Sequence, residues 1–448
     1  MIEGNIEING DFRKALNLME NSSKSLLITG RAGTGKSTLL RYFKGTTKKN
    51  IVICAPTGLA AVNVGGQTIH SLFRFPPKIL DDSDVRRVYN GIYKEIDAIV
   101  IDEISMVRAD LFDAIDMFMR LNGKDSMKPF GGAQLFLFGD LYQLPPVVEK
   151  EMGEIMRVIY ASPYFFDAKV MNHFSFEVIN LEKVYRQKDP IFVEFLDKVR
   201  LGNIDSETLE LVNNKVNKAK EESIIVTPTN RVANFINYER LNRLPETLHT
   251  YKAKIEGDFN LGVTNLPVDL ELNLKKGAKV IFVKNDTQGR WVNGTLGIVE
   301  ELNECEVKVK LNEDSSIVSV GAVDWDKIKY EYDRFSKKII AKVSGTLTQI
   351  PLRLAWALTI HKCQGQSLDS IHIDLSSGVW EFGHVYVALS RSRTLDGVGL
   401  ETKIKPNDIK IDYRVSEFLN KISKQSSKSI NYENKKEVNK DVSQTKLF

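Results

Sequence analysis

Residues 30–38 read Gly-Arg-Ala-Gly-Thr-Gly-Lys-Ser-Thr, and they lie between the apolar run 26–29 and a helical pattern that begins at Leu39. A glycine-rich turn between a strand and a helix lets backbone N–H groups converge on a phosphate at the helix N-terminus. The lysine of this pattern bridges the β- and γ-phosphates, and the hydroxyl that follows it is a magnesium ligand. We therefore expect a nucleoside triphosphate with Mg²⁺ to be bound by Gly33, Thr34, Gly35, Lys36, Ser37 and Thr38, with Ser37 as a ligand of the metal.

Two adjacent carboxylates, Asp102 and Glu103, follow the apolar run 98–101. Asp102 ends the predicted strand and is expected to hold Mg²⁺, while Glu103 accepts a proton from the water that attacks the γ-phosphate. A further strand, 134–138, leads to Gly-Asp and then to Gln143, which can orient that water or sense the γ-phosphate. Together with Lys36, these residues predict a nucleoside triphosphate hydrolase.

The order of the apolar runs predicts an α/β protein with two lobes. The runs 26–29, 51–54, 98–101 and 134–138 alternate with helical patterns, which is typical of parallel strands with crossover helices. A second series, 223–227, 354–359 and 370–374, predicts a second lobe. The stretches 51–63 and 224–234 are alike, since each has a strand, a Pro-Thr turn and a helix, as a duplication would produce.

Between the strands of the second series, residues of about 277–345 contain runs in which apolar and polar residues alternate. Turn-prone segments join these runs, which favours a small antiparallel barrel. We expect a first lobe at 1–180, a second lobe at 181–424 and a polar, disordered tail at 425–448.

Composition narrows the class of protein without identifying its partner. The chain has 448 residues, of which 42% are hydrophobic and 27% charged, so it is long enough for several globular units. Its net charge of +4 is too small to identify a nucleic-acid binder. The three cysteines predict neither a disulfide framework nor a zinc knuckle. Without an export signal or an apolar membrane segment, we expect a cytoplasmic protein with no metal besides the magnesium of the nucleotide.

The ordered set of motifs resembles the superfamily-one helicases, specifically the Pif (petite integration frequency) family, which is close to RecD. The resemblance runs from about Gly30 to Arg393. Besides the stretches above, it rests on Tyr-Arg-Gln at 185–187, on Leu-Ala-Trp-Ala-Leu-Thr-Ile-His-Lys-Cys-Gln-Gly-Gln at 354–366, and on Val-Tyr-Val-Ala-Leu-Ser-Arg at 385–391. Residues 110–120 resemble the helix that separates Pif proteins from their RecD relatives.

This resemblance implies two RecA-like P-loop NTPase lobes with parallel sheets, a β-barrel insertion in the second lobe, and a small wedge at about 64–92. It implies a monomeric DNA helicase that hydrolyses ATP, moves 5′ to 3′ on single-stranded DNA and opens duplexes, forks or G-quadruplexes, with RNA–DNA hybrids as a further substrate. The expected settings are replication, repair, recombination and telomere maintenance, on the nucleoid if the source is bacterial. By correspondence, Arg186 and Arg391 are arginine fingers, and Gly365 contacts the nucleotide.

Two kinds of residue are expected to contact DNA. Thr57 and Thr229, at the two Pro-Thr turns, can contact backbone phosphates, cap their helices, or do both. Family correspondence adds Gln67, His70, Phe73, Thr359, His361 and Lys362. Phe73 and Phe75 can stack on bases, although packing in the core is equally compatible with the sequence.

Some alternatives remain open at this level. Superfamily-one helicases carry an upstream glutamine that reads adenine, and residues 1–29 contain none, which leaves Asn9 or Asn17 as substitutes. A P-loop ATPase that signals to proteins, and a relative that acts on RNA, are the rival functions. Stimulation of ATP hydrolysis by DNA distinguishes a DNA helicase from an ATPase that signals to proteins. Competition between DNA and RNA distinguishes it from a relative that acts on RNA.

Overall fold

The computed structural model describes residues 8–424, except for 90, 149, 219, 221–222, 260–265, 334 and 423. The expected polar tail at 425–448 lies outside the described residues. Among the helices that are described, each is too short or too polar to cross a lipid bilayer.

The first lobe contains a six-stranded parallel sheet with the order β3-β2-β4-β5-β1-β6. Its strands are β1 (Leu26–Gly30), β2 (Ile51–Ala55), β3 (Gln67–Thr68), β4 (Ala98–Ile101), β5 (Gln134–Phe138) and β6 (Glu177–Leu181). Its helices are α1 (Gly10–Asn21), α2 (Lys36–Thr46), α3 (Gly58–Asn63), α4 (Ile69–Phe73), α5 (Ile92–Glu95), α6 (Ala109–Asn122) and α7 (Lys150–Ile159). All residues of β1 and β4 are buried, because helices cover both faces of the sheet.

The second lobe contains a four-stranded parallel sheet with the order β18-β7-β19-β20. Its strands are β7 (Ile224–Thr227), β18 (Ala357–Thr359), β19 (Ile371–Ile373) and β20 (Val398–Leu400). Its helices are α8 (Pro190–Leu201), α9 (Ser206–Asn213), α10 (Asn230–Arg243), α11 (Ile360–Cys363) and α12 (His384–Leu389). Only residues 357–359 of the predicted run 354–359 join this sheet. Residues 352–354 pair with an antiparallel strand of another sheet.

The two Pro-Thr turns have the same local structure. Thr57 (φ −117°, ψ 154°) and Thr229 (φ −116°, ψ 143°) are the N-caps of α3 and α10. Each hydroxyl oxygen accepts a hydrogen bond of 3.2 Å from the N–H three residues later. The capping role expected for both threonines is therefore confirmed, and this role leaves phosphate contact open.

Between β7 and β18 the chain forms antiparallel sheets that extend beyond the expected range of 277–345. A five-stranded sheet has the order β14-β13-β12-β11-β17, a second sheet pairs β10 with β8, and a third has the order β15-β16-β9. The strands are β8 (His249–Lys252), β9 (Lys254–Gly257), β10 (Glu271–Leu274), β11 (Lys279–Phe282), β12 (Leu296–Leu302), β13 (Glu306–Leu311), β14 (Ile317–Gly321), β15 (Val323–Asp333), β16 (Lys338–Gln349) and β17 (Leu352–Leu354). We call residues 249–354 the inserted domain.

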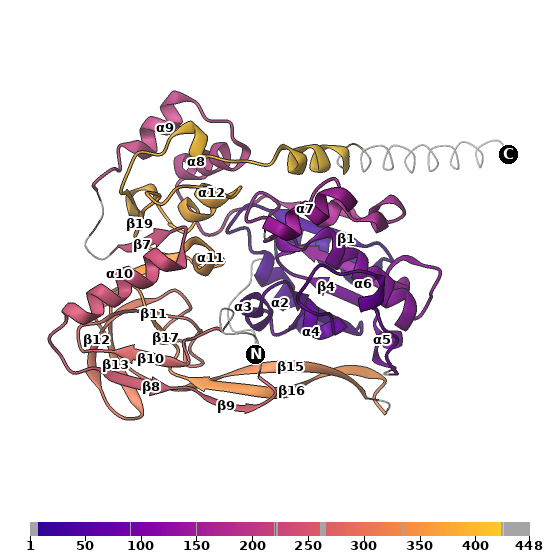
Figure 1. The fold of residues 1–448 in the computed structure, drawn as a ribbon, viewed down its shortest axis with the longest axis horizontal. Coiled ribbons are helices and arrows are strands. Elements are labelled where there is room, and N and C mark those ends of the chain that lie inside the picture. Colours follow the sequence, from indigo (N-terminus) through magenta and orange to yellow (C-terminus); the bar gives the residue numbers. More distant parts are fainter. Residues whose placement is uncertain are drawn as a thin grey trace, which may run out of the picture.

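The long hairpin of β15 and β16 leaves the inserted domain and reaches the first lobe (Figure 1). The Tyr330 hydroxyl accepts a hydrogen bond of 3.0 Å from the N–H of Ile53 on β2. The Gln67 amide donates to the carbonyl of Ile328. These contacts fasten the far end of the hairpin to the edge of the first sheet.

The end of the described chain also returns to the first lobe. Residues 413–422 are helical, and the Phe418 ring stacks on Phe166 with 4.3 Å between the ring centroids. Phe418 and Val415 join the hydrophobic core of the first lobe. The expected second lobe at 181–424 is therefore corrected at its end, because the apolar face of this helix packs on the other lobe.

Candidate nucleotide cleft and strand channel

The phosphate loop has the backbone that its glycines permit. Gly33 and Gly35 have φ of +83° and +86°, in the left-handed region that favours glycine. A Cβ on Gly33 would lie 2.5 Å from the Cβ of Arg186, so no side chain fits there. α2 begins at Lys36 without a side-chain cap, which leaves its first N–H groups available to an anion.

A cleft of about 730 Å³ adjoins this loop. All the residues predicted to bind the nucleotide or to carry its chemistry line the cleft: Gly33, Thr34, Gly35, Lys36, Ser37, Thr38, Asp102, Glu103, Gln143, Arg186, Gly365 and Arg391. The structure thus brings together residues that are up to 358 positions apart (391 − 33). Their individual roles stay predictions.

Lys36 contacts the backbone of its own loop. Its ammonium group donates to the carbonyls of Gly30 (2.7 Å) and Arg31 (2.9 Å). Burial lowers the pKa of Lys36, while the nearby charges of Asp140 and Glu103 act in the opposite direction. A half-buried cation that, among the described residues, donates to two carbonyls is suited to an anionic ligand.

The two carboxylates lie in an environment that favours a cation. Burial, and then the charge of Glu103, raise the pKa of Asp102, and burial raises the pKa of Glu103. A divalent cation beside Asp102 and Ser37 would favour the ionised form, so these residues fit the expected Mg²⁺. The backbone of Glu103 is left-handed, with φ 51° and ψ 47°, which is strained for a residue with a side chain.

Gln364 belongs to this site, although it was given no role from the sequence. Its amide group donates to a carboxylate oxygen of Glu103 (3.2 Å) and to the side-chain oxygen of Gln143 (3.3 Å). A residue that follows α11 in the second lobe thus contacts both polar side chains expected to handle the attacking water. Its position in the Gln-Gly-Gln of 364–366 was the available signal.

The two expected arginine fingers reach the cleft from beyond the first lobe. Arg391 is 1% exposed and donates to the carbonyls of Val387, Cys363 and Gln366. Arg186 donates to the carbonyls of Ser390 (3.2 Å) and Gly365 (3.3 Å). Burial lowers the pKa of both side chains, and the charge of Arg391 lowers that of Arg186 further. An anion bound between the two guanidinium groups would relieve their electrostatic repulsion.

A cluster of Asp140, Arg200 and Tyr386, which was not predicted from the sequence, joins the two lobes near the phosphate loop. Asp140 is fully buried, forms an ion pair of 2.9 Å with Arg200 on α8, and accepts a hydrogen bond of 3.0 Å from Tyr386 on α12. Burial acts to raise the pKa of Asp140, but the charges of Arg200 and Lys36 lower it below its usual value. The Tyr386 hydroxyl also accepts from the N–H of Ala32 (2.9 Å).

Of the two candidates for reading adenine, Asn9 lies nearer the cleft. Its amide group donates to the hydroxyl of Tyr185 (3.1 Å), and Tyr185 lines the cleft. Asn17 instead accepts a hydrogen bond from Asn21, one turn further along α1. Asn9 therefore remains the candidate.

A second hollow, of about 460 Å³, lies between the first lobe and the inserted domain, and we call it the strand channel. It brings together two of the predicted DNA contacts, Thr57 and His361. Its other cationic and aromatic lining residues were not predicted: Arg41, Lys284, Trp325 and Arg353. The Lys284 ammonium lies 5.3 Å from the centroid of the Trp325 ring.

Four side chains that were predicted to contact DNA are buried, and the structure corrects them. Phe73 and Phe75 are 1% and 5% exposed, and both pack against Phe118 in the core, so neither can stack on a base. Gln67 is buried under the hairpin, to which it donates. Thr359 is 3% exposed, and its hydroxyl caps α11 by accepting from the N–H of Lys362.

The remaining predicted contacts lie outside the lining of the strand channel. His70 is half-buried, and burial followed by the charge of Arg108 lowers its pKa. Lys362 is also half-buried, and burial lowers its pKa. Thr229 is half-exposed at the start of α10. Their contact with DNA stays a prediction.

Two parallel-sheet lobes that enclose a phosphate loop, paired carboxylates and two arginines define a P-loop nucleoside triphosphatase with a cleft between its lobes. A family model described as PIF1-like helicase matches residues 7–210. The chain is 33% identical over 435 residues to the ATP-dependent DNA helicase PIF1 of Mus musculus, covering 94% of this chain and 64% of that protein. The chain thus spans slightly less than two thirds of that relative.

Solved structures are similar over nearly the whole chain. A crystal structure of Bacteroides sp Pif1 in complex with ADP-AlF4 is 33% identical, with a TM-score of 0.85 that covers 93% of this chain and 97% of that one. Bacteroides Pif1 bound to ssDNA, also 33% identical, gives a TM-score of 0.68 over 94% of this chain and 98% of that one. This chain therefore belongs to the PIF1-like helicase family.

Proposed function

We propose that this protein is an ATP-dependent DNA helicase that couples hydrolysis in the nucleotide cleft to movement of a strand in the strand channel. The observation that carries the proposal is the wall shared by the two hollows. Asp102, Glu103 and Gly365 line both, together with Ser37 and Arg41. Gln364 lines the channel and donates to Glu103 in the cleft. A strand in the channel would therefore touch residues that also contact the reacting nucleotide.

In the nucleotide cleft, the residues of the first lobe bind and those of the second complete the site. Lys36 and the N-terminus of α2 hold the phosphates, and Mg²⁺ on Asp102 and Ser37 would neutralise part of their charge. Glu103 takes the proton of the attacking water, which Gln143 orients through its side-chain amide. Arg186 and Arg391 stabilise the charge that spreads over the transferred phosphoryl group.

Movement follows if the open and closed cleft bind DNA with different affinity. The capped turns at Thr57 and Thr229 give each lobe a separate place to hold a backbone phosphate. A change in the angle between the lobes would then shift one hold relative to the other. Only such a difference in affinity converts nucleotide binding into displacement.

The TM-scores with two solved structures support the proposal that the domains rearrange when a strand binds. Identity and coverage are almost the same for the ADP-AlF4 complex and the ssDNA complex, but the TM-score falls from 0.85 to 0.68. The lower TM-score therefore reflects a different arrangement of the domains relative to one another. We infer that binding of a strand moves this chain away from the arrangement described above.

Finer features of the activity belong to the same proposal. They are 5′ to 3′ polarity, action on forks, G-quadruplexes or RNA–DNA hybrids, action as a monomer, and a role in replication, repair, recombination or telomere maintenance. Their support is the resemblance of the motifs to the family.

The experiment is unwinding of duplexes that carry either a 5′ or a 3′ single-stranded tail, with Lys36→Ala as the inactive control. We expect ATP-dependent opening of the 5′-tailed duplex only. Hydrolysis is measured in parallel with single-stranded DNA, single-stranded RNA or neither. Equal hydrolysis under all three conditions would refute coupling to a strand, and stimulation by RNA alone would favour the RNA-directed rival.

A further inference from the structure

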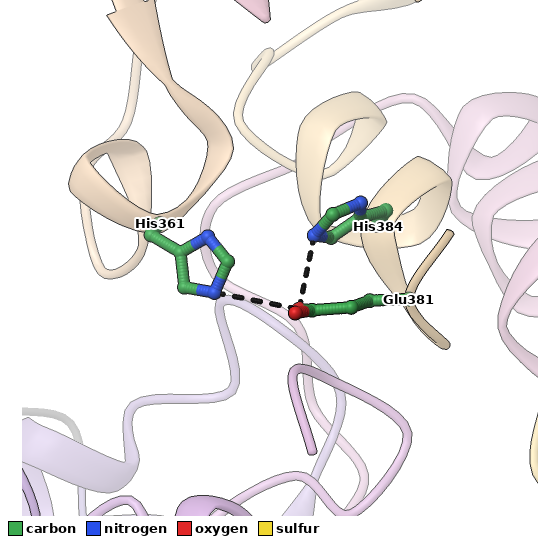
Figure 2. Close-up of side chains that lie close together, drawn as sticks. All are labelled: His361, Glu381 and His384. Carbon is green, nitrogen blue, oxygen red and sulfur yellow. Dashed lines mark ion pairs between the residues drawn. The ribbon is translucent and has the colours of Figure 1, made fainter. Parts of the chain in front are cut away.

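Three side chains from two segments of the second lobe converge beside the strand channel (Figure 2). His361 comes from α11, Glu381 from the loop before α12, and His384 from the first turn of α12. The Glu381 carboxylate oxygen lies 3.2 Å from Nε2 of His384 and 3.5 Å from Nε2 of His361. One ligand atom from each residue falls within 4.8 Å of the other two.

His384 needs a partner that the described residues do not fully supply. Its side chain is completely buried, and within the described part of the chain its Nε2 has only the ion pair with Glu381, while its Nδ1 has no partner. The Glu381 oxygen that faces both imidazoles has those two ring nitrogens as its partners. Buried polar atoms are nearly always paired, and leaving one unpaired costs about 1–3 kcal/mol. An ion at the centre of the cluster would bind Nε2 of His384 together with the Glu381 oxygen, whereas Nδ1 of His384 faces away from it.

The donor set and its spacing suit a transition metal. Zinc binds imidazole nitrogen at about 2.0–2.1 Å and carboxylate oxygen at about 2.0–2.2 Å, which places tetrahedral ligands about 3.3 Å apart. The separations of 3.2 Å and 3.5 Å bracket that value. Imidazole with carboxylate favours zinc and its first-row neighbours over calcium or magnesium.

We propose that His361, Glu381 and His384 bind one divalent transition-metal ion, for which Zn²⁺ is the best match. The side chains of His361 and Glu381 are 35% and 27% exposed, so an ion can enter and a water can complete the coordination. A bound ion would bring the imidazoles of His361 and His384 closer, because both would be its ligands. This site departs from the expectation of no metal besides magnesium, because His361 is distant in the sequence from Glu381 and His384.

The ion would tie together two segments that serve different hollows. His361 lines the strand channel, whereas α12 leads directly to Arg391 in the nucleotide cleft. Fixing α11 to α12 would hold the channel wall and the arginine in one relative position. The binding of the metal does not depend on the proposed helicase activity.

The test is titration of untagged, chelator-stripped protein with Zn²⁺ in excess Mg²⁺, followed by calorimetry and by metal analysis. Co²⁺ serves as a second probe, since its visible absorption reports tetrahedral ligands. We expect one equivalent of Zn²⁺ per chain and a higher Tm with the metal. His384→Gln and Glu381→Gln should each weaken binding at least about tenfold, since even indirect partners of a metal contribute that much.

His372→Gln is the matched control, because His372 also pairs with a glutamate, Glu401 at 2.7 Å, but has no second histidine. It should bind Zn²⁺ like the unaltered chain. Absence of stoichiometric binding to the unaltered chain would overturn the proposal. The proposal also fails if His384→Gln and Glu381→Gln bind Zn²⁺ as tightly as the unaltered chain, or if His372→Gln loses binding equally.

Discussion

The two parallel-sheet lobes contribute different charged groups to one cleft, because both of its carboxylates come from the first lobe. The first lobe supplies the phosphate loop and the carboxylates Asp102 and Glu103. From residue 181 onward, the charged side chains that line the cleft are all cations, Arg186, Lys188, Arg391 and Arg393. Under the proposed roles, the first lobe binds the nucleotide, and the charge of the transition state is stabilised when the other lobe is close.

The lobes also differ in how they hold their functional side chains. In the first lobe, Asp102 lies at the end of its own strand, β4, and Lys36 opens its own helix, α2. In the second lobe, Arg391 depends on carbonyls from α11, α12 and the turn between α11 and β19. Binding and hydrolysis should therefore be separable by substitutions in different lobes.

The largest effect is expected for Arg391→Ala. Loss of an arginine finger reduces kcat by about 10³-fold or more, while the first lobe keeps its affinity for ATP. Hydrolysis rates and nucleotide titrations measure the two effects. Arg290→Ala removes an exposed arginine paired with Asp286 and should leave basal hydrolysis unchanged.

Because Arg391 is buried, its removal also needs a check on folding. Arg391→Lys keeps the positive charge but lacks the fork that contacts three carbonyls, and it should lose most of the same activity. The Tm of each variant identifies loss of structure. A folded Arg391→Ala protein with a normal kcat would contradict the division of labour between the lobes.

Glu103→Gln should reduce hydrolysis by about 10²- to 10⁴-fold and trap ATP-bound protein on DNA. It should also stabilise the nucleotide-free protein at neutral pH, because burial raises the pKa of Glu103. A carboxyl group with a raised pKa binds more protons when folded than when unfolded, so stability falls as pH rises above the unfolded value.

The stability gain from Glu103→Gln therefore has a defined pH dependence. It should vanish in acid, where the glutamate is protonated in both states, and be complete above the raised pKa. Thermal unfolding from acid to neutral pH checks the sign. A gain that is constant across this range would contradict the electrostatic cause.

Gln364→Ala should affect the coupling of the two hollows more than it affects hydrolysis itself. Hydrogen bonds to charged groups contribute about 1.5–3 kcal/mol, so DNA-stimulated hydrolysis should fall by about ten- to a hundredfold. Basal hydrolysis of the same variant is the internal control and should change less. An equal loss of both rates would make Gln364 a part of the nucleotide site alone.

The smallest effect is expected for Tyr330→Phe, which removes the hydrogen bond between the hairpin and Ile53. If strand binding releases the hairpin, the variant should bind single-stranded DNA up to about fivefold more tightly, equivalent to about 1 kcal/mol. Fluorescence anisotropy measures the affinity, and Tyr413→Phe, at an exposed position, is the control. Weaker binding would show that the hairpin stays docked.

The sequence predicted the nucleotide cleft better than the strand channel. The phosphate loop, the strand that ends at Asp102 and the strand before Gln143 are short segments whose geometry depends on a few neighbouring residues. Phe73 and Phe75 illustrate the opposite case, since an aromatic side chain near an expected channel can face either solvent or core. Packing around Phe118 decided between them.

By itself, the sequence determined the two α/β lobes, the phosphate loop, the paired carboxylates and the family, because strand periodicity and glycine-dependent turns are local properties. Only the tertiary structure placed Gln364 on Glu103, Tyr386 on Asp140 and the Phe418 helix on the first lobe. It also placed His361 beside Glu381 and His384. These contacts join segments that are distant in the chain, and which side chains meet there is set by the packing of whole lobes.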